Sequence, residues 1–151
     1  MSANLYPIYS RAWDIQIAGS VIGPTANTNT DGTMVAGCNL IFTADPIEGG
    51  FVYKVILKPI TTVAATVARV FYCSNTAGPF VAGQTNGQLN TALLAEQALA
   101  AWTLSQTAAS PQYEIPINIG MPANTKLLMT FGTSTGAANN GYNPIVIAGK
   151  Y

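Results

Sequence analysis

Short runs in which apolar and polar residues alternate with a period of two recur along this chain of 151 residues. Trp13, Ile15 and Ile17 alternate with polar neighbours, and the stretch from Tyr113 to Ile119 repeats the pattern. Such alternation places successive side chains on opposite faces of a β-strand. Turn-forming Gly, Asn, Asp and Pro residues separate the runs. The pattern therefore restricts the fold to short strands joined by turns.

The runs and turns together predict about eight strands, with no repeat or linker that divides the chain. We therefore expect an all-β fold: a single β-sandwich of about eight antiparallel strands, jelly-roll-like, over residues 11–151, preceded by an N-terminal arm over residues 1–10. The strands are expected at Trp13–Ile17, Met34–Thr43, Phe51–Lys58, Thr66–Ser74, Leu89–Trp102, Tyr113–Ile119, Lys126–Thr133 and Pro144–Ala148.

The same alternation predicts which side chains form the core, since one face of each strand is expected to be buried. Pro116 cannot donate a hydrogen bond to a neighbouring strand, so its strand is expected at a sheet edge or at a local break. The residues expected in or beside the core are Trp13, Ile15, Ile17, Phe51, Tyr53, Val55, Ile115, Ile117 and Phe131.

One stretch has conflicting signals. Leu89–Trp102 is rich in Ala, Leu, Glu and Gln, which are good helix formers. Its surroundings are all strand-like, so we expect a strand there, with a helix as the alternative.

The polar chemistry of the chain is sparse. It has no histidine, its charged residues make up 8% of the total, and six Lys/Arg balance six Asp/Glu. Without a histidine or a close pair of acids, general acid–base and nucleophilic catalysis lack their usual groups, so we expect no enzyme. Scattered charges with a net charge of zero predict no nucleic-acid or membrane partner. No cofactor or metal site is expected.

A few residues carry narrower predictions. Arg69 lies within an apolar strand, and Glu96 is its expected ion-pair partner; solvent exposure and ligand binding are the alternatives. Cys38 and Cys73 lie in apolar runs and are expected to be buried, reduced thiols, because the start of the chain does not read as a signal peptide and a cytoplasm keeps thiols reduced.

Low charge also indicates that much of the surface is covered in an assembly. The first residues are unusually apolar for a chain terminus, and the last strand is apolar throughout, so both are expected at an interface. The expected contact residues are Leu5, Tyr6, Pro7, Ile8, Tyr9, Ile145, Val146 and Ile147.

An ordered set of segments in the second half of the chain resembles small head decoration, or cement, proteins of tailed bacteriophages. The segments are Ala68–Phe71, Leu93–Glu96, Thr103–Ser105, Glu114–Asn118, Met121–Ala123, Lys126–Thr133 and Ala148–Tyr151.

The resemblance implies a β-sandwich, often trimeric, that binds the major capsid protein on the outer surface of a phage head and holds neighbouring capsomers together. It implies a protein made in the host bacterial cytoplasm and located in the virion. The alternative is a tail-fibre or receptor-binding module that contacts host glycan, for which Trp102, Tyr113 and Tyr142 are the candidate aromatic residues. A major capsid protein is a weaker alternative, because a chain that forms a shell is normally longer.

Overall fold

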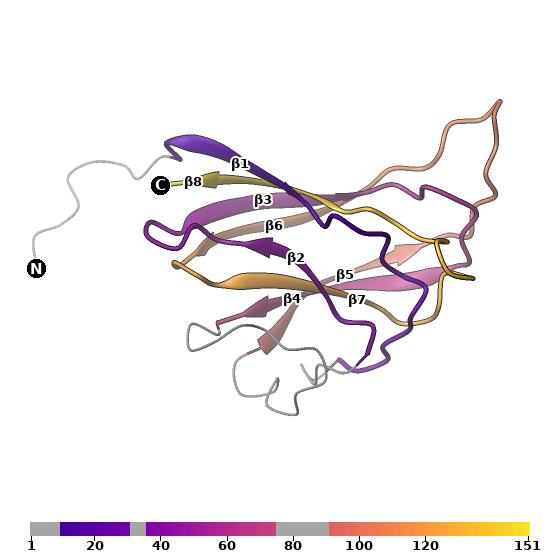
Figure 1. Ribbon diagram of the computed structural model, residues 1–151, viewed down its shortest axis with the longest axis horizontal. Helices are drawn as coiled ribbons and strands as arrows, with labels where there is room; N and C mark the ends of the chain where they lie inside the picture. Colours follow the sequence, from indigo (N-terminus) through magenta and orange to yellow (C-terminus); the bar gives the residue numbers. More distant parts are fainter. Residues whose placement is uncertain (1–9, 31–35, 75–90) are drawn as a thin grey trace, which may run out of the picture.

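The computed structural model describes residues 10–30, 36–74 and 91–151, which fold into two packed β-sheets (Figure 1). Each sheet has four strands, in the order β1-β8-β3-β6 in one and β2-β7-β4-β5 in the other. The strands are β1 (Ala12–Ile17), β2 (Asn39–Thr43), β3 (Gly50–Leu57), β4 (Thr66–Cys73), β5 (Thr91–Leu99), β6 (Tyr113–Met121), β7 (Lys126–Phe131) and β8 (Ile145–Lys150).

The topology is that of a jelly roll. β1 pairs with β8, β2 with β7, β3 with β6 and β4 with β5, all antiparallel, so the chain resembles one long hairpin rolled into a sandwich. Further antiparallel pairing of β8 with β3 and of β7 with β4 completes each sheet. The predicted all-β sandwich with jelly-roll-like strand order is confirmed.

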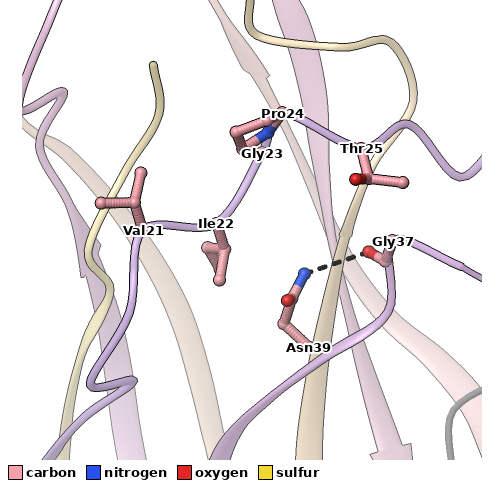
Figure 2. Close-up of a pocket in the computed structure, with 7 residues that line it drawn as sticks. All are labelled: Val21, Ile22, Gly23, Pro24, Thr25, Gly37 and Asn39. Atoms are coloured by element: carbon pink, nitrogen blue, oxygen red, sulfur yellow. Dashed lines mark hydrogen bonds between the residues drawn. The ribbon is translucent and has the colours of Figure 1, made fainter. Parts of the chain in front are cut away.

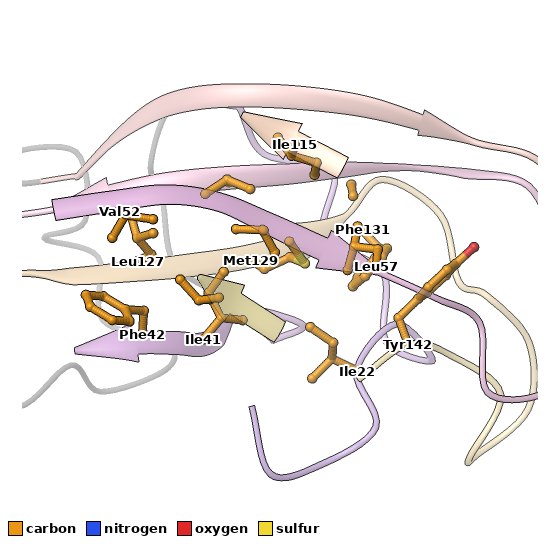
Figure 3. Packing of buried hydrophobic residues seen from close by; sticks show 14 of the residues in the cluster. Ile22, Ile41, Phe42, Val52, Leu57, Ile115, Leu127, Met129, Phe131 and Tyr142 are labelled. Atoms are coloured by element: carbon orange, nitrogen blue, oxygen red, sulfur yellow. The ribbon is translucent and has the colours of Figure 1, made fainter. Parts of the chain in front are cut away.

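The core lies between the sheets (Figure 3). Val55, Ile115 and Phe131 are buried there as predicted, and Ile117 packs against them half-buried. The ring of Tyr142 stacks on that of Phe131, with centroids 5.6 Å apart and planes 11° apart. Aromatic stacking of this kind adds to the free energy gained by burying the rings.

The stretch with helical propensity forms strand β5, as its context predicts. β5 pairs along its length with β4, and these tertiary hydrogen bonds outweigh a local preference worth only a few tenths of a kcal/mol per residue. β6 lies at the edge of its sheet, which confirms the position expected from Pro116. β2 is shorter than predicted, because Ala36 and Gly37 form a turn before it begins.

The prediction for β1 is wrong. Trp13, Ile15 and Ile17 point away from the core, and Asp14 and Gln16 point inward. The reason is that β1 is an edge strand whose inner side faces the rim of the other sheet. There the Gln16 amide donates to the backbone oxygen of Thr43 over 2.9 Å and accepts from its N–H over 3.0 Å.

The prediction for β3 is partly wrong. Phe51 and Tyr53 lie on the outer side of the sheet, while Val52 and Val55 are both buried. The register with β8 shifts between Val52 and Lys54, so Tyr53 is an extra residue on β3. A β-bulge of this kind reverses the alternation on one side of it, which a strict period of two cannot anticipate.

None of the described segments is a helix with the length and apolarity needed to span a membrane.

Candidate interaction surface

The outer side of the β1-β8-β3-β6 sheet carries three rows of side chains that run across β1, β8 and β3. The first row is Trp13, Gly149 and Phe51; the second is Ile15, Ile147 and Lys54; the third is Ile17, Ile145 and Ile56. Because paired residues of an antiparallel sheet share a face, their side chains form one continuous surface. We call this surface the outer apolar face: Trp13, Ile15, Ile17, Phe51, Tyr53, Ile56, Ile145 and Ile147.

The outer apolar face is strongly exposed along β1. Trp13 is 70% exposed, Ile15 56% and Ile17 58%. Isolated exposed apolar residues are common on protein surfaces, but a contiguous patch usually marks a contact site. The arrangement therefore suits protein contact.

Aromatic side chains gather at the first row. The ring centroid of Tyr53 is 5.8 Å from that of Trp13 and 5.0 Å from that of Phe51. Gly149 of β8 lies between β1 and β3 in this row. Ser10 packs so closely over Gly149 that a side chain at position 149 would collide with it. A hollow of about 260 Å³ opens here between Ser10, Trp13 and Tyr53, with Arg11 and Ala12 completing its lining.

Charges at the edges of the outer apolar face are paired. Lys54 contacts Glu114 over 2.8 Å, and Arg11 contacts Glu48 over 2.5 Å. Hydrogen bonds from Lys54 and from Gln112 lower the pKa of Glu114 below its usual value. A partner can therefore cover the apolar rows without burying an isolated charge, which would be costly.

The predicted interface residues divide between three places. Ile145 and Ile147 belong to the outer apolar face, but Val146 points into the core and is fully buried, so it is not available to a partner. Leu5–Tyr9 lies outside the described residues.

Most of the outer apolar face was missed by the sequence prediction, because Trp13, Ile15 and Ile17 were assigned to the core. The alternation in β1 is equally compatible with either face being buried. The available signal was Gln16, whose amide has the donor and acceptor needed to pair with a backbone peptide group.

A second hollow, of about 180 Å³, lies between the segment at residues 21–25 and the turn before β2 (Figure 2). Its lining residues are Val21, Ile22, Gly23, Pro24, Thr25, Gly37 and Asn39, none of which is titratable. Asn39 donates its side-chain amide to the backbone oxygen of Gly37 over 3.1 Å. The hollow thus offers no titratable side chain that could activate the hydroxyl of Thr25.

The predicted ion pair between Arg69 and Glu96 is confirmed, at 2.7 Å. The two residues lie directly opposite each other on β4 and β5, and Arg69 also donates to the backbone oxygen of Asn27 over 3.3 Å. Gly132 leaves the room that the guanidinium occupies. Arg69 therefore has a structural role that joins two strands and a loop.

Cys38 and Cys73 are both buried, reduced thiols, as predicted. They belong to a small cluster with Phe71 and Leu128. Burial, with a smaller contribution from Cys73, raises the pKa of Cys38 to about 12, so its thiol stays protonated at neutral pH. A protonated thiol is a poor nucleophile, so Cys38 is suited to packing.

The comparisons with known proteins add little. No protein-family model and no curated protein matches the sequence. The solved capsid asymmetric unit of cyanophage Pam1 contains a chain similar to this one, with a TM-score of 0.36 and 14% identity over 99% of this chain and 93% of that one. A TM-score this low carries no inference about function.

Proposed function

We propose that this protein is a structural virion protein that decorates the outer surface of a tailed-phage head and stabilises contacts between capsomers. The observation that carries the proposal is the outer apolar face, a contiguous surface of exposed Trp and Ile side chains edged by paired charges. The segments that resemble decoration proteins and the low charge of the chain support it. Jelly rolls occur among capsid domains and also among lectins, so the fold alone does not choose between them.

A decoration protein needs contact area and many copies, and it needs no catalytic group. Binding through several copies makes a modest contact energy per subunit sufficient, because each bound copy raises the effective concentration of the next. In the described part of the chain, no three His, Cys, Asp or Glu side chains gather into a metal site.

The alternative, a glycan-binding module, loses its candidate residues in the structure. Tyr142 is fully buried and stacked on Phe131, so it cannot contact a sugar. The hydroxyl of Tyr113 accepts a hydrogen bond from the backbone of Ala100 over 3.0 Å, and Trp102 is half-buried in a bridge with Val63. These three side chains do not form an exposed aromatic platform.

The test is co-sedimentation of the purified protein with phage heads that lack it. The full chain is expected to pellet with the heads, and Ile15→Lys/Ile17→Lys is expected to bind more weakly. Each isoleucine is more than half exposed, and completing its burial against a partner contributes about 1 kcal/mol or more. Losing both contributions should weaken the affinity for heads roughly 30-fold or more.

The matched control is Leu104→Lys. Leu104 is 50% exposed but lies in the connection between β5 and β6, away from the outer apolar face. The Leu104→Lys variant should therefore bind heads as tightly as the full chain. Failure of the full chain to pellet with such heads would overturn the proposed function, and equal loss in both variants would show that the face has no special part in it.

A further inference from the structure

We propose that the outer apolar face of one subunit is the seat of residues Leu5–Tyr9 of a neighbouring copy, so that subunits are joined by exchanged N-terminal arms. The inference rests on the proposed function and deepens it: the arm is what covers the outer apolar face directly, and the face supports head binding by joining the copies that bind the head together.

The described chain begins at the outer apolar face itself. Ser10 lies over Gly149 in the first row, and its hydroxyl is 3.3 Å from that of Tyr53. The N–H of Arg11 donates to the backbone oxygen of Lys150 over 2.7 Å, which ties this point to the end of β8. Residues 1–9 are therefore attached to the molecule at the edge of the apolar rows.

The length and chemistry of that segment match the surface. Its nine residues reach at most about 30 Å, whereas the rows from Trp13 to Ile17 extend over roughly 13 Å. The segment holds no charged side chain, and Leu5–Tyr9 reads Leu-Tyr-Pro-Ile-Tyr. Pro7 restricts its own backbone and that of Tyr6 to extended conformations, which lowers the entropy lost on docking.

The area of contact favours an arm that comes from a neighbouring copy. Three strands of the sheet, with the rows from Trp13 to Ile17, present a footprint on the order of 200 Å². A stable interface buries about 800 Å² on each partner, so two such faces pressed together are too small. An arm adds two tyrosines at roughly 150–250 Å² each, together with Leu5, Pro7 and Ile8, which brings an exchanged contact close to the required size.

The charges are compatible with this occupant. Lys54 is already paired with Glu114, and Arg11 with Glu48, so an uncharged apolar arm can cover the rows without separating either pair. A charged peptide would lack a counter-ion there.

The test uses cysteine pairs in the full chain. Ile8→Cys in a tagged chain and Ile15→Cys in an untagged chain are co-expressed, purified together and oxidised. A disulfide between tagged and untagged chains necessarily joins two subunits. Because a docked arm gives an effective concentration in the millimolar range, we expect at least about tenfold more of this product than with Leu104→Cys in place of Ile15→Cys. The native cysteines are buried in every variant.

Two results would overturn the inference. One is a cross-link yield no higher than that of the Leu104→Cys control. The other is a link that forms within a single chain when Ile8→Cys and Ile15→Cys are combined in one molecule and mixed with wild type.

A second measurement does not depend on cysteine chemistry. Deletion of residues 1–9 should leave the melting temperature of the sandwich unchanged but convert the oligomer to monomer by light scattering, and an unchanged oligomer would contradict exchange. Neither measurement uses phage heads. Cross-linking without head binding would therefore reject only the proposed function, and head binding without cross-linking would reject only the arm exchange.

Discussion

Gln16 joins the two sheets at their open edge, and its replacement offers a sharp test of why β1 faces the way it does. Its amide makes two hydrogen bonds to Thr43, a donor bond of 2.9 Å and an acceptor bond of 3.0 Å, and also donates to Asp14 over 3.1 Å. This side chain replaces the backbone pairing that an edge strand lacks.

Gln16→Leu keeps the size of the side chain and removes both bonds to Thr43. Each bond contributes about 0.5–1.5 kcal/mol, and the half-buried peptide groups of Thr43 lose their partner, so the expected loss is about 2 kcal/mol. For a domain of this size that corresponds to a fall in melting temperature of roughly 4–8 °C. Gln16→Glu should cost more at neutral pH, because a carboxylate would then face the backbone oxygen of Thr43 and the carboxylate of Asp14.

Urea unfolding followed by tryptophan fluorescence measures the change. The midpoint should shift without a change in slope, since the surface exposed on unfolding is the same. Gln97→Leu is the control, because the Gln97 amide donates to the backbone oxygen of the next residue, Ala98, within the same strand; it should change the free energy of unfolding by less than about 0.5 kcal/mol. If Gln16→Leu is as stable as this control, the bonds to Thr43 do not hold β1 in its orientation.

Three further predictions concern single side chains. Glu96→Gln should lower the free energy of unfolding by about 1 kcal/mol, and by less at high salt, because the carboxylate paired with Arg69 is 47% exposed; equal loss at both salt concentrations would contradict this. Tyr142→Phe should unfold at the same urea concentration or a higher one, because among the described residues its buried hydroxyl has no hydrogen-bond partner, whereas Tyr142→Ala should lose several kcal/mol. Burial raises the pKa of Cys38 from 9.0 to about 12, so the folded chain retains a proton that the unfolded chain releases. Stability is then fully present below about pH 9 and falls as the pH rises toward 12, and Cys38→Ala should flatten that fall in urea titrations at alkaline pH.

The strand pattern of this protein could be predicted from its sequence because strand formation depends on short-range order. Alternation, β-branched residues and turn formers located the eight strands that the described residues form, and Pro116 indicated an edge. The pair of Arg69 and Glu96 could be anticipated for a similar reason, since two opposite charges in neighbouring apolar strands gain by meeting.

The face that each strand buries was decided only by the tertiary structure. A period of two is symmetric, so Trp13, Ile15 and Ile17 fit equally well inside or outside until the position of β1 is known. At that edge the inward side meets the backbone of Thr43, where the Gln16 amide can bond and an isoleucine cannot. In β3, the bulge at Tyr53 turned Phe51 outward, and a bulge depends on the register of two partner strands far away in the sequence. The outer apolar face therefore arises from long-range pairing, which local periodicity does not encode.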